Sequence, residues 1–233
     1  LISIKEKLKS SDVENLGAEF YKKINFGKNN EYFLISDTIF TKIDNFLGHF
    51  LHGLKLKSYE FNKYKSKKEK KTVSIHVTGN KNKPSQQSQI KFKALEEGTF
   101  YARDLVSEPG NILHPDEYAK RINSLRKYGL KINVYDDKKL KKLGMHALLG
   151  VGQGSIRGSY LVTMEWKGIK NNSKPLAFVG KGVCFDTGGY SLKPARFMED
   201  MTYDMAGSAT VVGLMKNFAL RKAKINAVGV VGL

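Results

Sequence analysis

The sequence predicts an α/β fold, in which strands of a sheet alternate with helices. From residue 130 onward, short apolar runs of strand length alternate with segments of helical pattern. The composition is 41% hydrophobic, which suits a globular protein with a core. The length of 233 residues is enough for one large domain or two small ones. Such alternation favours a sheet covered by helices on both faces.

The first part of the chain carries two short strand patterns with a helical pattern between them. Residues 33–36 and 73–77 are apolar runs of strand length. Residues 39–56 place apolar side chains on one helical face, namely Ile43, Phe46, Leu47, Phe50, Leu51 and Leu54. We therefore expect a helix over 39–56.

Two polar stretches separate these elements from the rest of the chain. The lysine-rich run 63–71 predicts a solvated loop, and a polyanion-binding patch is the less favoured alternative. The stretch 79–89 is polar and rich in structure-breaking residues, which is typical of a linker. We therefore predict an N-terminal domain over 1–84 and a second domain over 85–233.

The second domain begins with two predicted helices. The first covers 90–106 and stops before Pro109-Gly110. The second covers 115–128, has proline in its first turn and ends at Gly129. After them the pattern predicts strands at 130–135, 159–166, 176–180 and 227–231, with helices at 137–143 and 206–219.

Charge, cysteine content and hydropathy indicate which partners and which cellular compartment to expect for the protein. The net charge of +18 raises a nucleic-acid partner as an alternative, but most of the cations are lysines, and a general lysine bias is favoured. The single cysteine, Cys184, excludes an internal disulfide and favours a reducing, cytoplasmic compartment. No apolar stretch approaches the ~20 residues of a membrane span, so no membrane partner is expected.

The stretch 179–193 carries the chemistry. It follows a predicted strand, and three glycines flank Asp186, so the backbone can turn sharply and approach a ligand. A phosphate loop is excluded, because Gly182 rather than Ser or Thr follows Lys181. Cys184 has no neighbouring base in sequence and fits a small buried residue better than a nucleophile. The remaining chemical interpretation is a site in which carboxylates hold cations and a lysine polarises a substrate.

These residues closely resemble the leucyl aminopeptidase family of dinuclear metallopeptidases. The resemblance is strong over 90–233, and the motifs that carry it are 180–189, 191–194, 198–201 and 203–207, with 102–111, 114–115 and 150–155 upstream. Before residue 90 it is thin. It implies a partial, macro-like N-terminal α/β domain followed by a mixed-sheet α/β peptidase domain. Residues 1–79 contain no glycine loop for phosphate, which argues against the alternative of a nucleotide-binding module.

The resemblance also implies a role for five residues. Lys181 would bind metal through its amine, Asp186 would bridge two metals, and Asp204 would bind the tighter one. Lys193 would polarise the scissile carbonyl, and Met201 would line the pocket for the first side chain. Ordinary alternatives are a solvated lysine for the two lysines, a turn or helix cap for the two aspartates, and core packing for Met201.

The family implies an aminopeptidase that removes N-terminal residues, preferably apolar ones such as leucine, from peptide substrates. It also implies two divalent metal ions (zinc or manganese), bicarbonate in the full-length protein, and a homohexamer. The family's later Asn-Thr-Asp-Ala-Glu-Gly-Arg motif does not occur in this chain. We therefore expect a truncated catalytic domain that is inactive by itself. Cys184 and Tyr190 stand where relatives are expected to have Thr or Ile.

Overall fold

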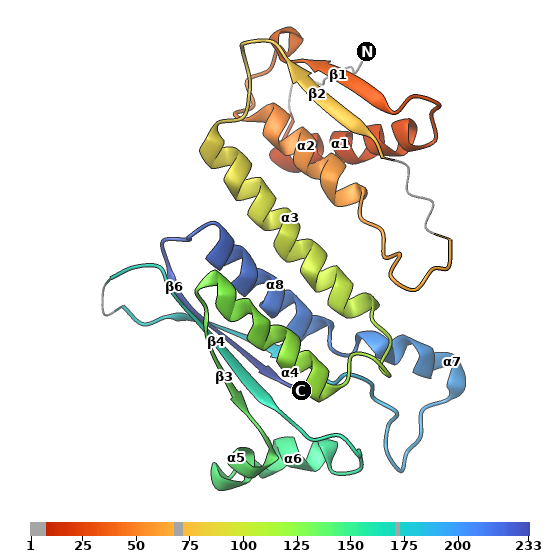
Figure 1. Cartoon of the computed structure of the whole chain (residues 1–233), viewed down its shortest axis with the longest axis vertical. Helices are drawn as coiled ribbons and strands as arrows, with labels where there is room; N and C mark the ends of the chain where they lie inside the picture. The colour runs from red at the N-terminus through yellow and green to blue at the C-terminus, as the bar shows by residue number, and fades with distance from the viewer. Residues whose placement is uncertain (1–7, 68–71, 171–172) are drawn as a thin grey trace. The chain divides into compact units, whose positions relative to one another are not determined.

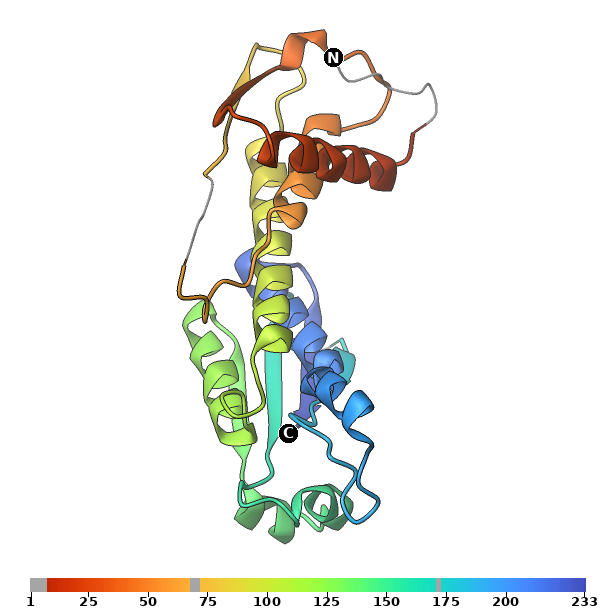
Figure 2. The ribbon, with the colours of Figure 1, turned by 90° about the vertical axis from the view of Figure 1, so that its right-hand side faces the viewer.

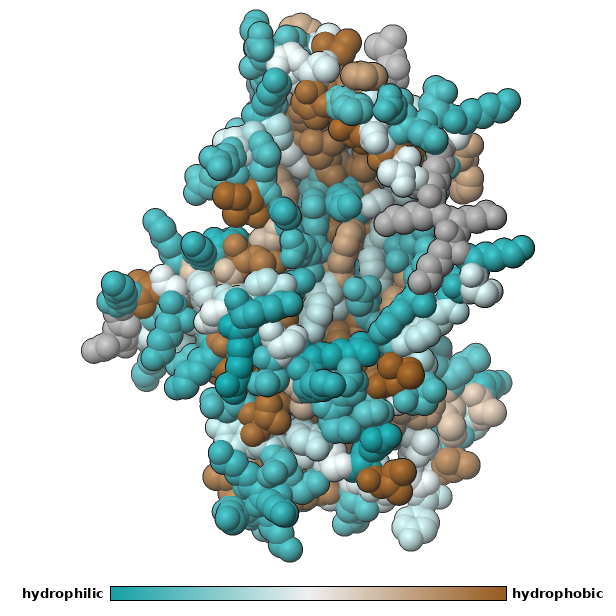
Figure 3. Space-filling view, viewed as in Figure 1, coloured by the Kyte–Doolittle hydropathy of each residue, from teal (hydrophilic) through white to brown (hydrophobic). Residues whose placement is uncertain are grey.

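The computed structural model describes residues 8–67, 72–170 and 173–233, in two compact units, Leu1–Glu96 and Glu97–Leu233 (Figure 1). The division falls within the long helix α3 (Gln86–Ser107). The boundary expected from sequence, between residues 84 and 85, stays a prediction. Of the lysine-rich run 63–71, residues 68–71 lie outside the described residues. On the face in Figure 3, hydrophilic side chains predominate, as the net charge of +18 leads one to expect.

The first unit packs two helices against a two-stranded parallel sheet. Strands β1 (Glu31–Ile35) and β2 (Ser74–Thr78) pair with Phe33 opposite His76. Helix α2 (Phe46–Lys57) lies against α1 (Ser10–Asn25), and Figure 2 shows the two crossing. Their apolar faces form the core of this unit, made by Val13, Ile24, Phe46, Leu47, Phe50 and Leu54.

Glycines allow α1 and α2 to touch backbone to backbone. A Cβ at Gly17 would lie 1.9 Å from the carbonyl oxygen of Phe50, and one at Gly53 would lie 1.9 Å from that of Glu14. Any larger residue at either position would therefore force the helices apart.

The second unit contains a four-stranded mixed sheet in the order β3-β4-β6-β5. Strand β5 runs parallel to β6, and β4 is antiparallel to both β6 and β3. The strands are β3 (Lys131–Tyr135), β4 (Leu161–Lys167), β5 (Leu176–Lys181) and β6 (Asn226–Gly232). The helices are α4 (Pro115–Asn123), α5 (Asp137–Lys142), α6 (His146–Gly152), α7 (Ala195–Met198) and α8 (Ala206–Leu220), with 3-10 turns η2 (Ser124–Tyr128) and η3 (Glu199–Tyr203).

The core of the second unit lies between one face of this sheet and helices α4 and α8 (Figure 1). Alternate residues of β4 and β6, such as Val162, Met164 and Val231, are fully buried there. Leu176 and Val179 of the edge strand β5 are largely exposed. The sequence predicts helices on both faces of the sheet, whereas in the described part of the chain helices cover one face.

The predicted mixed α/β class is confirmed, and most elements lie where the sequence places them. The expected helix 39–56 begins only at Phe46, because Asn45 has a left-handed backbone, with φ of 52°. Helices α1 and α6 were not predicted. The expected helix 115–128 is α4 followed by the 3-10 turn η2, and it ends at Gly129, whose φ is +92°. In the part of the chain that the structure describes, no helix is long and apolar enough to cross a membrane.

A second glycine pair brings α3 against α8 within the second unit. A Cβ at Gly213 would lie 2.5 Å from the carbonyl oxygen of Gly98, and a Cβ at Gly98 would lie 2.5 Å from that of Gly213. Both obstacles are backbone atoms, so a rotamer change cannot relieve the overlap. Helix α8 directly follows the segment that holds Asp204, so this contact helps to position the candidate site.

We predict that Gly213→Ala destabilises the second unit by about 1–3 kcal/mol, because α3 and α8 must separate to admit a methyl group. Urea unfolding followed by circular dichroism measures the change. Gly150→Ala is the matched control, since Gly150 lies in helix α6 with no atom within 4 Å of the added Cβ. Its free energy of unfolding should stay the same or rise slightly, because alanine favours a helix. Equal unfolding curves for the two variants would refute the packing argument.

Candidate metal centre

Lys181 and Asp204 meet because the end of β5 packs tightly against the first turn of α8. A Cβ at Gly180 would lie 2.6 Å from the Cα of Ser208 and 2.7 Å from the carbonyl oxygen of Gly207. Lys181 is the last residue of β5, and Asp204 lies two residues before α8. Lys181 Nζ therefore donates to Asp204 Oδ1 at 2.7 Å. The pair lies at the carboxyl end of a parallel strand, where α/β folds commonly bind ligands.

A glycine turn brings Lys193 back to Asp186. Gly188 and Gly189 have φ of +91° and +71°, which L side chains rarely adopt. The Gly188 amide donates to Asp186 Oδ1 at 2.8 Å, and the Lys193 amide donates to the Thr187 carbonyl at 2.9 Å. This closed turn places Lys193 Nζ 2.8 Å from Asp186 Oδ2.

The Lys193 ammonium has three acceptors. Besides Asp186 Oδ2, it donates to the Asp186 carbonyl oxygen at 3.1 Å and to Met201 Sδ at 3.0 Å. An ammonium has three donors, so this environment can satisfy all of them. The five residues singled out in the sequence thus form two contact groups, Lys181 with Asp204, and Lys193 with Asp186 and Met201. The charge of Lys181 also acts on Asp186, and we call these five residues the cluster.

The surrounding charges keep Asp186 ionised. Its pKa is lowered mainly by the hydrogen bond from Lys193 and then by the Gly188 amide, and the charge of Lys181 acts in the same direction. Partial burial opposes these effects but is the weaker influence. At neutral pH the site therefore presents a carboxylate that can accept a cation.

The donor set fits a divalent metal ion. In residues 8–67, 72–170 and 173–233, no group of three or more His, Cys, Asp and Glu side chains could hold a metal. The cluster instead offers two carboxylates, and Lys181 would add a nitrogen ligand once its ammonium gives up a proton to become an amine. Such oxygen and nitrogen ligands are of the kind that zinc and manganese accept. Asp204 Oδ2 is buried and has no hydrogen-bond partner among the described residues. A buried carboxylate oxygen without a donor is costly unless a cation approaches it.

The sequence missed two contributors to this geometry. Gly188 supplies a backbone donor, and Gly180 permits the close approach of α8. The many glycines in this stretch pointed to both residues, but the sequence did not show what each one does. The functional roles inferred for the five residues stay predictions.

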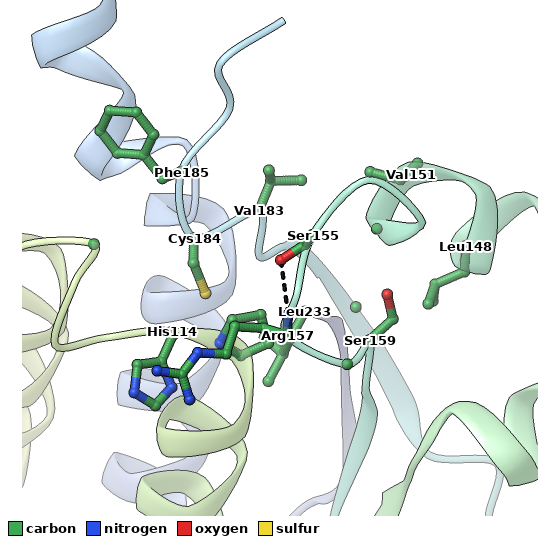
Figure 4. A pocket seen from close by; sticks show the side chains of 15 residues that line it. His114, Leu148, Val151, Ser155, Arg157, Ser159, Val183, Cys184, Phe185 and Leu233 are labelled. Carbon is green, nitrogen blue, oxygen red and sulfur yellow. Dashed lines mark hydrogen bonds between the residues drawn. The ribbon is translucent and has the colours of Figure 1, made fainter. Parts of the chain in front are cut away.

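A pocket of about 320 Å³ is lined in part by residues 183–185, which directly precede Asp186 in the chain (Figure 4). Its lining, all within the described residues, includes Cys184 and Phe185 but none of the five predicted residues. Figure 4 shows the Cys184 side chain directed toward His114 and Arg157, while Phe185 points the other way. Leu148 and Val151 come from α6, a helix that was not predicted, so no pattern in the sequence indicated this wall.

Comparison with known proteins finds one matching family model and many relatives. Residues 100–233, more than half of the chain, match the model of the cytosol aminopeptidase family, catalytic domain. A probable cytosol aminopeptidase of Brucella melitensis is 50% identical over 191 residues, which cover 78% of this chain and 39% of that protein. One of Nitrobacter winogradskyi is 43% identical over 233 residues, which cover 97% of this chain and 46% of that protein.

Two solved structures share the fold. The bottromycin maturation enzyme BotP in complex with Mn has a TM-score of 0.83 and 26% identity, over 97% of this chain and 48% of its own. The cytosol aminopeptidase of Coxiella burnetii has a TM-score of 0.80 and 23% identity, over 95% of this chain and 46% of its own. The chain thus spans less than half the length of these four proteins.

We predict that Cys184 is unreactive toward thiol reagents in the folded chain. Burial raises its pKa to about 12, and the charge of Asp116 adds to this. At pH 8, the thiolate fraction is therefore about a thousandfold lower than that of a thiol with the ordinary pKa of 9.0. Reaction with Ellman's reagent should be slow in buffer and fast in guanidinium chloride.

The control is a single-thiol variant, Cys184→Ala with Lys174→Cys, whose thiol lies at an exposed position. It should react at a similar rate in both solvents. If native Cys184 reacts as fast as this exposed thiol, it is not buried as described.

Proposed function

Because this chain belongs to the cytosol aminopeptidase family, we propose that its cluster of lysines and aspartates is part of a metal-dependent aminopeptidase site. The substrates would be peptides, and the preferred N-terminal residues would be apolar ones such as leucine. Aminopeptidase, hydrolase and protease are the classes that the family supports. None of the comparisons supports the nucleic-acid alternative that the charge of +18 raised.

The observation that carries the proposal is the meeting of an amine and two carboxylates beyond one strand end. Lys181, Asp186 and Asp204 would hold the divalent cations, and Asp204 Oδ2 already lacks a donor among the residues described. The similar enzyme BotP was solved in complex with Mn, which supports a divalent metal for this fold. Bound cations would supply Lewis-acid polarisation of the scissile carbonyl.

Lys193 would act on the substrate rather than on the cations. Its ammonium would donate to the carbonyl oxygen as negative charge develops there during attack by water. Met201, whose Sδ lies 3.0 Å from Lys193 Nζ, would line the space for the first side chain and help to aim that ammonium. An apolar thioether wall favours an apolar side chain over a charged one.

Further properties follow from family membership alone. We propose zinc or manganese as the metals, bicarbonate as a helper in proton transfer, a homohexamer as the assembly, and the cytoplasm as the location. None of these depends on a particular contact in the described residues.

The proposed activity predicts metal-dependent hydrolysis of leucyl amides. The protein expressed from its complete gene should release leucine from leucyl-p-nitroanilide with Mn²⁺ or Zn²⁺ and lose this activity after dialysis against a chelator. Adding the metal back should restore the rate, and a glutamyl substrate should be cleaved more slowly. Full activity after complete metal removal, checked by mass spectrometry, would overturn the proposal.

The separate roles of Lys193 and Asp186 predict different losses in two variants. In the same complete protein, Lys193→Ala should lower kcat about 10²–10³-fold while metal content is kept, because one donor to the developing oxyanion is lost. Asp186→Ala should lose metal as well as activity, because a carboxylate ligand is removed. Metal content and steady-state kinetics are measured on the same samples. Equal metal loss in both variants would contradict the assignment.

A further inference from the structure

Two buried hydroxyl groups join helix α4 to the first turn of α8. Tyr118 and Ser208 are both fully buried, and their side-chain oxygens lie 2.9 Å apart. The Ser208 hydroxyl donates its single hydrogen to the Met205 carbonyl oxygen at 2.7 Å. The hydrogen between the two hydroxyls therefore comes from Tyr118. We call this series of hydrogen bonds, from Tyr118 through Ser208 to Met205, the hydroxyl link.

The hydroxyl link begins at a group that stays protonated and well packed. Burial raises the pKa of the Tyr118 phenol, and the hydrogen bond with Ser208 opposes this effect only in part. Around neutral pH the phenol therefore keeps its hydrogen and remains a donor. Its ring belongs to the apolar core of the second unit, together with Ile122 and Met205.

The Ser208 side chain lies where both members of the Lys181–Asp204 pair are anchored. A Cβ at Gly180 would lie 2.6 Å from Ser208 Cα, and one at Gly182 would lie 3.0 Å from Ser208 Oγ. These two glycines directly precede and follow Lys181. The carbonyl group that accepts from Ser208 belongs to the residue after Asp204. One buried side chain thus contacts the segments that carry the lysine and the aspartate.

We propose that Tyr118 and Ser208 are positioning residues, which hold this lysine–aspartate pair in the geometry for metal binding. The proposal rests on the proposed function, because it assumes that Lys181 and Asp204 hold the cations. Ser208 would act on the pair through its contacts with the two backbone segments. Tyr118 would act through Ser208, by fixing the direction of its hydroxyl group. Groups that orient metal ligands commonly affect metal affinity without touching the metal.

A contribution to stability alone is the competing explanation, and it makes a different prediction. Ser208→Ala leaves the Tyr118 hydroxyl buried without its acceptor, which destabilises the fold. Changing Tyr118 to Phe as well leaves two apolar groups in contact, so that stability returns. The hydrogen bond to the Met205 carbonyl is absent in both variants. Stability and metal affinity should therefore respond differently to the second substitution.

The test is a double-mutant cycle with Tyr118→Phe, Ser208→Ala and both together, in the protein expressed from its complete gene. Mn²⁺ affinity is measured from the electron paramagnetic resonance signal of the free ion, and stability from the midpoint of thermal unfolding without metal. Ser208→Ala should weaken Mn²⁺ binding about threefold to tenfold, and Tyr118→Phe about twofold to fivefold. Adding Tyr118→Phe to Ser208→Ala should raise the unfolding midpoint and change Mn²⁺ affinity by less than about twofold.

Tyr101→Phe is the matched control, because it removes the same chemical group from another hydrogen bond to α4. The Tyr101 hydroxyl donates to the Arg121 carbonyl oxygen at 3.1 Å, which joins α3 to α4. Its loss leaves the hydrogen bonds in the first turn of α8 unchanged. Tyr101→Phe should lower the unfolding midpoint and leave Mn²⁺ affinity within about twofold of that of the unaltered protein.

The outcomes separate the positioning role from the proposed function. If the unaltered protein binds Mn²⁺ and neither Ser208→Ala nor Tyr118→Phe changes the affinity, the positioning role is refuted and the metal site stands. The role is also refuted if Mn²⁺ affinity recovers together with stability in the double variant, or if Tyr101→Phe weakens binding as much as Tyr118→Phe. If the unaltered protein does not bind Mn²⁺, the positioning role and the metal-dependent function both fall. Tyr118→Phe keeps the buried ring, so its comparison with Tyr101→Phe decides the matter if Ser208→Ala does not fold.

Discussion

The contact between the end of β5 and the first turn of α8 is the constraint on which the candidate site depends. The backbone atoms of Gly180 approach Gly207 and Ser208 so closely that no side chain fits between them. This contact fixes the distance between Lys181, which ends the strand, and Asp204, which precedes the helix. The position of α8 depends in turn on the glycine crossing with α3, so packing in the core determines the geometry of charged groups at the surface.

Charge balance within the cluster follows from this geometry. Two ammonium groups face two carboxylates, and each carboxylate has a lysine within 2.8 Å. A different arrangement holds Arg121, whose guanidinium donates to both Glu108 and Glu117. A guanidinium is a permanent cation with a rigid fork, suited to a fixed structural pair, whereas an ammonium on a flexible stem can exchange its acceptor.

The sequence was sufficient for the fold class and for most strands, because these depend on local patterns. The five site residues, which depend on a specific motif, stay predictions. Helix α1 was missed although Val13 and Ile24 are buried on one face. The start of α2 was placed too early, since Ile39 and Ile43 keep the apolar spacing and pack against the core without being helical. The pairing of each lysine with its aspartate could not be predicted, because it depends on how closely backbones approach across the fold.

The place of β6 has a consequence for how the second unit folds. It is the latest of the four strands in sequence, yet it lies inside the sheet between β4 and β5. Neither neighbour can complete its hydrogen bonding until β6 arrives, and its partners on β4 are far away along the chain. Contacts of long sequence separation form slowly. During synthesis, β5 and its glycine loop therefore leave the ribosome before β6, the strand that pairs with them in the sheet.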